Sequence, residues 1–449
     1  MNIIICNGPG ILDNGQEVIL FPSRWDSGIP HGRKKPFAFF PYELAILSQL
    51  LKRELKQHAI KFLDGNLEGW NGDTYIRKLT QQFIGVPFGE PRVLICELSA
   101  LTYPTMTRVM QELRQILDGE PFRAILCGPM GAYDKQRALD DGWTDVVVGE
   151  YELKVLELLG GIVPDEARTN GLVNLDWLPW PEDFDVDRSR YREINHYIDY
   201  RSNAAIVQLY ATRGCPLSCT FCVVPSLYGG HGKSHRSHRC RDVEDVCNEI
   251  VYLSELYPTF SGAFFNDEAH NANAEWFASF CEALIARGLN RYQYDAMCGM
   301  WSFTPELVQL AKRAGYRQIR FGLESTSEAV GKAIKKTLSR DRTESFLGWL
   351  KDAGIGAYAT IQVGAMGSTE ASDRKTIADV KEWIRRGMIQ KWQLSTSTPQ
   401  PNTPFYDLCK RNGWLVTENP EDFDGYRATV NFPDYPAHRI QAVRDEAGL

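Results

Sequence analysis

Short apolar runs alternate with helix-forming stretches along almost the whole chain, and this alternation limits the possible folds more than any other feature. In the first 160 residues the apolar runs predict five strands, at 2–6, 60–63, 92–96, 124–127 and 145–148. Helical periodicity lies between them, near 41–56, 74–84, 104–117 and 133–140. Strands separated by helices pair in parallel, because each crossover helix returns the chain to the same end of the sheet. We therefore expect an α/β fold that begins with a doubly wound, Rossmann-like parallel sheet.

A second region of the same kind follows a segment rich in proline and charge. Six strands are predicted there, at 204–210, 262–266, 291–296, 317–323, 356–363 and 391–397. Helical patterns lie at 242–256, 274–287, 304–314, 326–336, 342–353, 372–386 and 404–412. Six β/α units form a partial (β/α)6 barrel, whose site is expected at the carboxyl ends of the strands. The expected domains are 1–160 and 201–412, joined by a linker, 161–200, and followed by a C-terminal tail, 413–449.

Three cysteines stand close together directly after the first strand of the second region. Cys215, Cys219 and Cys222 are separated by three and two residues. Soft thiolates suit iron–sulfur clusters and zinc, and closely spaced cysteines can converge on one inorganic group. Three thiolates would bind three irons of a [4Fe–4S] cluster and leave the fourth iron open to a ligand. The alternative is a zinc knuckle with Cys240 or His231 as its fourth ligand.

This Cys-x3-Cys-x2-Cys motif, with an aromatic residue (Phe221) before the third cysteine, resembles the signature of the radical S-adenosylmethionine (SAM) enzymes. The six β/α units resemble their partial barrel. The resemblance implies a [4Fe–4S] cluster whose open iron is chelated by SAM. One electron then cleaves the sulfonium and gives a 5′-deoxyadenosyl radical. It also implies an electron donor such as flavodoxin or ferredoxin, and an organic substrate that the sequence does not identify.

Further motifs of this family follow the other barrel strands. Residues 264–268 end in Glu268, Phe321–Ser325 matches Gly-x-Glu-Ser, and 361–370 resembles Gly-x-Pro-Gly-Glu-Thr, although Ala365-Met366 departs from it. Pro399–Pro404 resembles Pro-x-Pro-Gly-Thr, with Asn402 in place of glycine, and asparagine tolerates positive φ. The resemblance implies a SAM site built from Phe221, Glu268, Glu324, Ser325 and Gln362.

Cys298, after the third barrel strand, is a candidate catalytic residue. It could face the site as a hydrogen-atom donor, and the alternative is a buried structural cysteine. The basic stretch 229–241 contains His231, His235 and His238, but it has no rigid metal-ligand spacing. Its arginines, Arg239 or Arg241, could neutralise charge at a cluster or substrate.

The strands and loops of residues 1–160 resemble the cobalamin-binding domain that precedes many radical SAM enzymes. Ser99–Thr105 matches its Ser/Thr-rich loop, Cys127–Met130 stands at its Gly-Gly-Pro-His position, and Val148–Glu150 matches its Arg-Gly-Glu turn. Leu178–Pro181 matches the Leu-Pro-x-Pro linker. The resemblance implies a cobalamin site made of Ser99, Leu101, Thr102, Gly128, Pro129, Gly149 and Glu150. The Asp-x-His-x-x-Gly motif that supplies an axial histidine is missing, so cobalamin would bind base-off. A degenerate domain without the cofactor would have the same pattern.

Together these resemblances imply a class B radical SAM methyltransferase-like enzyme, which methylates an unactivated carbon with cobalamin. One alternative starts with the same radical and ends in cyclisation, rearrangement, dehydrogenation or coupling without methyl transfer. Another is a non-catalytic metal-binding module.

Composition limits the partners and the compartment. The net charge of −7 implies no general attraction to nucleic acid or anionic membranes. The N-terminus lacks a signal-peptide pattern, and no apolar run is long enough to span a membrane, so a cytoplasmic location is expected. The eleven cysteines do not resemble a secreted disulfide framework. An insertion at 15–41 carries Arg24-Trp25 and 31–35, which could contact substrate or the other domain or could form a solvated loop.

Overall fold

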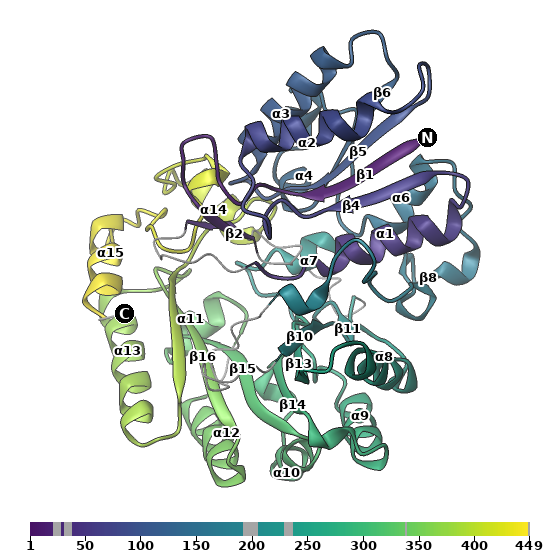
Figure 1. Cartoon of the computed structure of the whole chain (residues 1–449). Coiled ribbons are helices and arrows are strands. Elements are labelled where there is room, and N and C mark those ends of the chain that lie inside the picture. The colour runs from purple at the N-terminus through teal and green to yellow at the C-terminus, as the bar shows by residue number, and fades with distance from the viewer. Residues whose placement is uncertain (21–27, 31–37, 192–204, 229–236, 337–338, 448–449) are drawn as a thin grey trace. The chain divides into compact units, whose positions relative to one another are not determined.

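The computed structural model describes residues 1–20, 28–30, 38–191, 205–228, 237–336 and 339–447 (Figure 1). The chain divides into two compact units, residues 1–194 and 195–449. Each unit contains one large parallel sheet, so the α/β class is confirmed.

Some residues named from the sequence lie outside the described part of the chain. These are Arg24, Trp25 and 31–35 of the insertion, together with His231 and His235.

The first unit is built on a five-stranded sheet of order β4-β1-β5-β6-β7 (Figure 1). All its pairings are parallel. The strands are β1 (Asn2–Asn7), β4 (Ala59–Leu63), β5 (Arg92–Glu97), β6 (Phe122–Cys127) and β7 (Asp145–Val146). The helices are α1 (Tyr42–Glu54), α2 (Gly72–Ile84), α3 (Tyr103–Ile116), α4 (Pro129–Tyr133), α5 (Lys135–Asp140) and α6 (Glu152–Leu158). The strand order reverses between β1 and β5, and in such sheets ligands bind beyond the carboxyl ends of the strands at that point.

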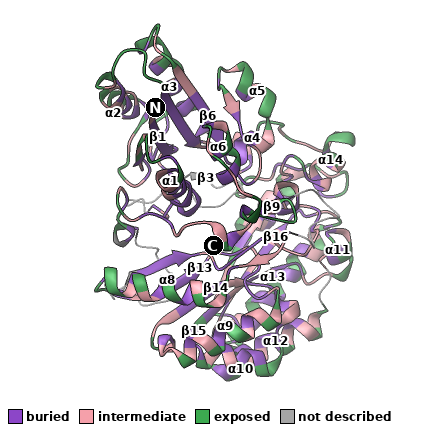
Figure 2. Cartoon of the chain, turned by 90° about the vertical axis from the view of Figure 1, so that its right-hand side faces the viewer, coloured by how far each residue is buried: buried purple, intermediate pink, exposed green. Residues whose placement is uncertain are grey.

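The central strands of this sheet are buried on both faces. Ile3, Ile4 and Ile5 of β1 are at most 1% exposed, which explains their unbroken apolar run (Figure 2). The helix expected at 133–140 is α5, and a further short helix, α4, precedes it. Asp134 lies between them with φ −149° and ψ 80°, and its side chain accepts a hydrogen bond from Arg137 N at 2.9 Å. An aspartate at this position starts a new helix and ends the old one.

Two short hairpins belong to the first unit as well. One pairs β2 (Val18–Leu20) with β3 (Gly28–Pro30), within the insertion. The other pairs β8 (Arg168–Thr169) with β9 (Leu172–Val173), within residues 161–191. Residues 161–191 are fixed to the α/β core of the first unit by two hydrogen bonds of 2.6 Å. One runs from Ser48 Oγ to Glu182, and the other runs from Tyr191 Oη to Asp64.

The second unit contains a six-stranded parallel sheet in sequential order, β10-β13-β14-β15-β16-β17. Its strands are β10 (Ala205–Leu209), β13 (Phe260–Phe265), β14 (Gln293–Cys298), β15 (Tyr316–Glu324), β16 (Gly356–Val363) and β17 (Lys391–Thr396). Its helices are α7 (Val224–Leu227), α8 (Val243–Leu256), α9 (Ala274–Ala286), α10 (Pro305–Arg313), α11 (Glu328–Ala333), α12 (Arg340–Ala353), α13 (Glu370–Arg385), α14 (Pro404–Arg411) and α15 (Ala437–Glu446). Each of the six barrel strands that the sequence predicts is present.

This sheet curls into a half-barrel with two different faces. Along β16, Ala357, Ala359 and Ile361 are buried against the surrounding helices, whereas Tyr358 and Gln362 are only half-buried on the concave face. Alternate residues of a strand point to opposite faces, so every second residue of each strand lines the concavity. The polar residues at the carboxyl ends of the strands therefore meet at one edge.

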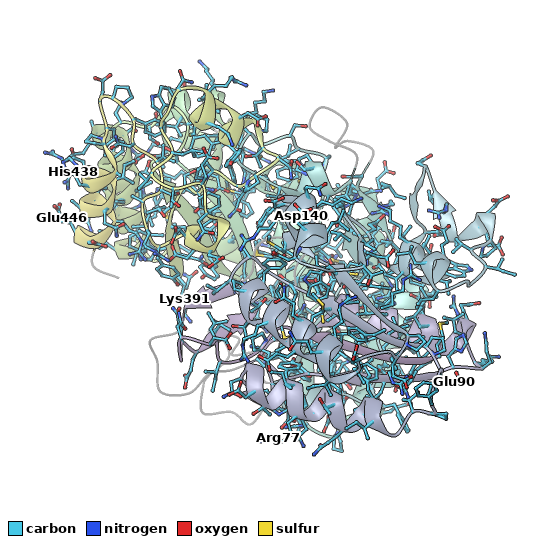
Figure 3. All side chains as sticks on the ribbon, turned by 90° about the horizontal axis from the view of Figure 1, so that it is seen from above. Arg77, Glu90, Asp140, Lys391, His438 and Glu446 are labelled. Atoms are coloured by element: carbon cyan, nitrogen blue, oxygen red, sulfur yellow. The ribbon has the colours of Figure 1, made fainter. Side chains whose placement is uncertain are left out.

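Residues 413–447 pack on the second unit near its last strand. Thr396 N at the end of β17 donates a hydrogen bond of 2.8 Å to Gly425 O. Glu446 on α15, labelled in Figure 3, pairs with Arg374 of α13 at 2.8 Å. These contacts cover an edge strand that would otherwise expose unpaired backbone groups. Among the described residues, no helix is long and apolar enough to cross a membrane.

Candidate active site

The three clustered cysteines lie in the loop that follows β10. This loop runs from β11 (Thr212–Arg213) to α7 and is held next to β12 (Arg239–Cys240), which pairs with β11 in antiparallel fashion. Cys219 is buried, and Cys215 and Cys222 are half-buried. In the described part of the chain, no three His, Cys, Asp or Glu side chains converge on a single metal ion. A cubane is larger than one ion, so its thiolates stand farther apart than the ligands of a lone zinc.

The electrostatic surroundings of the thiols couple their ionisation to metal binding. Burial raises the pKa of Cys215 to about 12 and raises the pKa of Cys219 and Cys222 as well. The charge of Lys336 acts in the opposite direction on all three. Thiols of this kind lose their protons when a metal binds them.

Gly214 sets the shape of the cysteine loop. Its φ is +89°, and a Cβ built on it would lie 2.3 Å from the carbonyl oxygen of Ser237. Only glycine fits a backbone that is both left-handed and this close to a neighbouring chain.

Gly214→Ala is therefore expected to destabilise the protein and to displace the cysteine loop. Gly413→Ala is the matched control, because Gly413 has φ +66° but a Cβ there would meet no atom within 4 Å. In the control, alanine loses only the free energy of a left-handed backbone at a non-glycine residue, about 1–2 kcal/mol. In urea denaturation Gly214→Ala should lose more stability than the control, and an equal loss would show that the loop tolerates a Cβ.

A group of three polar side chains stands at the same edge of the half-barrel. Glu324 Oε1 accepts a hydrogen bond from Lys336 Nζ, and its Oε2 accepts one from Gln362 Nε2, both at 2.8 Å. A β-bulge interrupts the pairing of β15 with β16 just before Glu324, whose φ is +62°. Bulges and left-handed non-glycine residues are concentrated at functional sites, where they aim a side chain.

Gly322 leaves room for this ion pair. A Cβ at Gly322 would stand 2.2 Å from Glu324 Oε1 and 2.4 Å from Lys336 Nζ. Burial lowers the pKa of Lys336, but Glu324, Cys219 and Cys215 together raise it to about 12. Lys336 therefore carries a fixed positive charge beside the cysteine loop.

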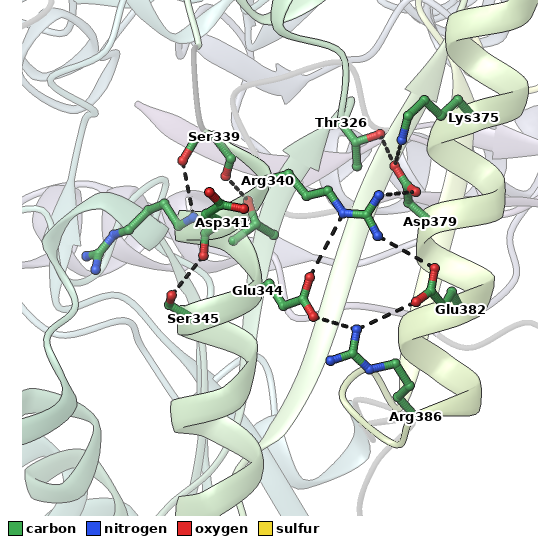
Figure 4. Close-up of polar contacts among 12 residues, drawn as sticks. Thr326, Ser339, Arg340, Asp341, Glu344, Ser345, Lys375, Asp379, Glu382 and Arg386 are labelled. Atoms are coloured by element: carbon green, nitrogen blue, oxygen red, sulfur yellow. Dashed lines mark hydrogen bonds and ion pairs between the residues drawn. The ribbon is translucent and has the colours of Figure 1, made fainter.

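The segment after Glu324 is fastened to α13. Ser325 Oγ lies 3.1 Å from Thr376 Oγ1, and Thr326 Oγ1 donates to Asp379 Oδ2 at 2.7 Å. Figure 4 shows that Asp379 also contacts Lys375 of the same helix and Arg340 of α12. The Ser325 hydroxyl also accepts a hydrogen bond from Ser327 N at 3.2 Å, so its described contacts are with α13 and with the backbone ahead of α11.

Phe221 of the cysteine loop packs on neighbouring apolar residues, and the start of α14 is hydrogen-bonded to the same loop. Phe221 contacts the apolar cluster of Val330, Ile334 and Ala365. Phe405 N at the start of α14 donates to Thr220 O at 3.0 Å. The positive φ expected for Asn402 is confirmed, at +64°.

Glu268 also lies at this edge, where both of its carboxylate oxygens accept hydrogen bonds. Gly214 N donates to Oε2 at 2.9 Å, and Tyr228 Oη donates to Oε1 at 2.8 Å. The structure thus brings Glu268, Glu324 and Gln362 to the same edge as the cysteine loop.

Cys298 is placed differently. Asp295 of the same strand pairs with Arg320 at 2.6 Å on the concave face. Cys298 stands three residues after Asp295, so its side chain points to the opposite face of the sheet. Its thiol lies on the helix-facing side, where burial raises its pKa well above the usual value. This placement agrees with a buried structural cysteine.

The basic residues after the cysteine loop are engaged with the protein. Arg241 pairs with Asp245 and with buried Glu249, so its charge is used within the fold. Arg239 Nε donates to Ser237 O at 3.1 Å, and its guanidinium lies over the ring of Tyr228. His238 lies near Ala269 O, and burial lowers its pKa.

In the first unit, the residues named for a cobalamin site lie at the carboxyl edge of the sheet. Ser99 and Thr102 are buried with their hydroxyl oxygens 3.2 Å apart, and Leu101 between them is half-exposed. Gly128 packs against Glu97 and Leu98 rather than against open space. The remaining residues are Pro129 at the start of α4, Gly149, and Glu150, which accepts a hydrogen bond of 2.9 Å from Val173 N.

The comparison with sequence families identifies the second unit. Residues 209–380 match the family described as the Radical SAM superfamily. Residues 209–380 therefore form a radical SAM domain. This domain is one of enzymes, and it implies SAM and a [4Fe–4S] cluster as cofactors.

Relatives and a solved structure extend this result. The chain is 28% identical to cytidylyl-2-hydroxyethylphosphonate methyltransferase of Streptomyces wedmorensis over 47% of this chain and 40% of that protein. It is 26% identical to an anaerobic magnesium-protoporphyrin IX monomethyl ester cyclase of Rubrivivax gelatinosus, over 67% of this chain and 55% of that one. The matched region thus spans about half the length of these curated relatives.

The fold is similar to that of TsrM from Kitasatospora setae, a radical SAM methyltransferase solved with cobalamin and a [4Fe–4S] cluster bound. The TM-score is 0.64 at 15% identity, and the match covers 93% of this chain and 79% of TsrM. The likeness therefore shows a shared fold across both units.

Two residues at this site were missed by the sequence analysis. Lys336 lies twelve residues after Glu324, in a stretch that the sequence marks only as helical. Tyr228 follows the third cysteine with no motif around it. The stretch contains Lys332, Lys335 and Lys336, and no local signal separates Lys336 from the two exposed lysines.

Proposed function

We propose that this radical SAM enzyme binds its [4Fe–4S] cluster through Cys215, Cys219 and Cys222 and methylates an unactivated carbon with the help of cobalamin. The observation that carries the proposal is the single edge of the half-barrel where the cysteine loop meets the Glu324, Lys336 and Gln362 group. A bound cluster and SAM supply one-electron cleavage of the sulfonium bond, which yields a 5′-deoxyadenosyl radical.

The cysteine loop fits a cluster by its chemistry. Cys219 is buried and Cys215 and Cys222 are half-buried, so water has limited access to the three thiols. Lys336 brings a buried positive charge close to them, which offsets the negative charge of three thiolates. Soft thiolates, shielding and a nearby cation are the features by which proteins hold an iron–sulfur cluster and set its potential.

Glu324, Gln362 and Lys336 fit the polar parts of SAM. SAM carries an ammonium, a carboxylate and two ribose hydroxyls. The Glu324 carboxylate can accept hydrogen bonds from the ammonium or the ribose, and the Lys336 ammonium can balance the carboxylate. The bulge and the left-handed backbone at Glu324 hold these groups in place before the ligand arrives. Ser325 and Phe221 would then support the site through α13 and the apolar cluster beside the loop.

The electron would come from a flavodoxin- or ferredoxin-type donor. All eleven cysteines of the chain are free thiols, as suits a protein of the reducing cytoplasm. The carbon to be methylated belongs to an organic substrate that would occupy the concave face.

The first unit supports the cobalamin part of the proposal. Its sheet has the strand order that binds ligands at a switch point, and Ser99, Leu101 and Gly149 lie at that carboxyl edge. Cobalamin supplies a methyl group held on cobalt. In the described part of this unit the only histidine is His58, which precedes β4 at the opposite, amino edge. The described residues of this unit thus place no histidine beside the proposed site, and the binding mode that we propose is base-off with no histidine ligand.

The experiment is anaerobic loading with hydroxocobalamin, followed by gel filtration and an absorption spectrum. We expect the wild-type protein to retain cobalamin with a base-off spectrum. Leu101→Trp should release it, because the larger ring would fill the space beside the half-exposed Leu101. Phe88→Trp is the matched control, since Phe88 is 88% exposed ahead of β5 at the amino edge.

One specific observation favours a second function. A relative in Rubrivivax gelatinosus is named a cyclase, so the same radical could serve cyclisation or another reaction without methyl transfer. Wild-type protein that forms 5′-deoxyadenosine from SAM but retains no cobalamin would support this alternative and contradict methylation.

A further inference from the structure

We propose that Glu268 and Tyr228 form a latch that holds the cysteine loop in position, and that Glu268 serves the cluster rather than SAM. This inference rests on the proposed cluster at Cys215, Cys219 and Cys222 and adds a positioning device to it.

The latch joins the two ends of the loop through one carboxylate. Gly214 N donates to Glu268 Oε2 at 2.9 Å, and Gly214 directly precedes the first cysteine. Tyr228 Oη donates to Glu268 Oε1 at 2.8 Å, and Tyr228 follows α7, beyond the third cysteine. Each oxygen of the carboxylate thus accepts one hydrogen bond from a residue that flanks the three cysteines. A carboxylate that accepts from a backbone N–H makes one of the stronger hydrogen bonds in proteins.

The neighbouring residue anchors the latch to the barrel. Asp267 accepts hydrogen bonds from Ala211 N at 3.0 Å and Thr212 N at 3.1 Å, just before the loop begins. Its Oδ2 also lies 2.6 Å from His270 Nδ1, and His270 Nε2 lies 2.7 Å from Tyr316 Oη on β15. Asp267, His270 and Tyr316 are at most 1% exposed. The carboxyl end of β13 therefore fixes the start of the cysteine loop through Asp267. Glu268 then binds Gly214 and Tyr228 on the two sides of the three cysteines.

The same carboxylate would act on the cluster electrostatically. Net charge and hydrogen bonding around a cluster set its reduction potential. A negative charge next to the cysteine loop disfavours the added electron, so a neutral residue at position 268 should raise the potential. Removal of the Tyr228 hydroxyl leaves the charge in place and loosens only one end of the loop. The two substitutions thus separate the charge from the hydrogen bond.

The test compares Glu268→Gln, Tyr228→Phe, the double variant and Glu275→Gln, an exposed control on α9. In the apoprotein, both latch variants should speed alkylation of Cys215 by iodoacetamide, because the loop is freed. In the reconstituted protein, they should lose iron to a chelator about tenfold faster, as expected for one lost charged hydrogen bond. The double variant should lose iron no faster than the worse single variant. Only Glu268→Gln and the double variant should raise the midpoint potential in an EPR-monitored titration.

Two results would overturn the latch. The first is a tenfold or greater loss of SAM affinity in Glu268→Gln, with Cys215 alkylation unchanged in both variants, which would make Glu268 a SAM ligand. The second is a rate of iron loss and a midpoint potential in the latch variants that equal those of Glu275→Gln. A wild-type protein that binds no iron contradicts the proposed function instead, and the alkylation rates of the apoprotein still decide whether the loop is held by Glu268.

Discussion

Cys219→Ala should leave the protein without a [4Fe–4S] cluster and without SAM cleavage. Cys219 is the middle cysteine of the loop and lies near both Lys336 and Glu324. Alanine would remove one of three thiolates that together bind the cluster. The two remaining thiols are protonated at neutral pH in the absence of a metal, because burial raises their pKa. Cys215 and Cys222 alone would leave a second iron of the cluster without a protein ligand.

The measurement has two parts. Anaerobically reconstituted wild-type protein should bind about four irons per chain and absorb in the visible range. With reductant and SAM it should form 5′-deoxyadenosine, and the variant should fall to the level of a protein-free control. Cys409→Ala is the matched control, because Cys409 is buried in α14 among Phe405 and Val430 and should keep its iron.

The same preparations distinguish the zinc knuckle from the cluster. Cys240 is paired through its backbone with Thr212 on the neighbouring strand. A knuckle that used Cys240 would hold one zinc ion, and Cys240→Ala would release it. Stoichiometric zinc without visible absorption in the wild-type protein, together with loss of that zinc in Cys240→Ala, would contradict the cluster and support the knuckle.

The sequence predicted the strands well because they carry a local signal. A strand such as β1 is buried on both faces and appears as an unbroken apolar run, while β16 alternates buried and half-buried residues. Parallel pairing then brings every strand's carboxyl end to one edge. For this reason Glu324, Gln362 and the cysteine loop could be expected to lie together before any distance was known.

Other features depend on contacts that no local pattern contains. Lys336 matters because it reaches Glu324 across the space left by Gly322. Glu268 could be placed at a strand end, but its partners Gly214 and Tyr228 come from a different loop. Composition alone marked 161–200 as a linker, whereas its described part is tied to the first unit through side chains such as Tyr191.

Lys336→Met should destabilise the second unit and weaken SAM binding. The Lys336 and Glu324 side chains are only 13% and 9% exposed, so their ion pair is largely shielded from water. Loss of the lysine would leave a buried carboxylate with Gln362 as its remaining described partner. Removal of one partner from a buried pair costs about 3–5 kcal/mol, because the other charge remains without compensation.

A double variant separates the structural role of this pair from its role in binding. In Lys336→Met with Glu324→Gln no unpaired charge remains, so much of the stability lost in the single variant should return in urea denaturation. SAM affinity should stay low in both variants, because neither the cation nor the carboxylate is available to the ligand. Lys332→Met, an exposed position on α11, should change neither quantity. If Lys336→Met unfolds like the wild-type protein, or if the double variant recovers SAM binding, the pair does not organise the SAM site.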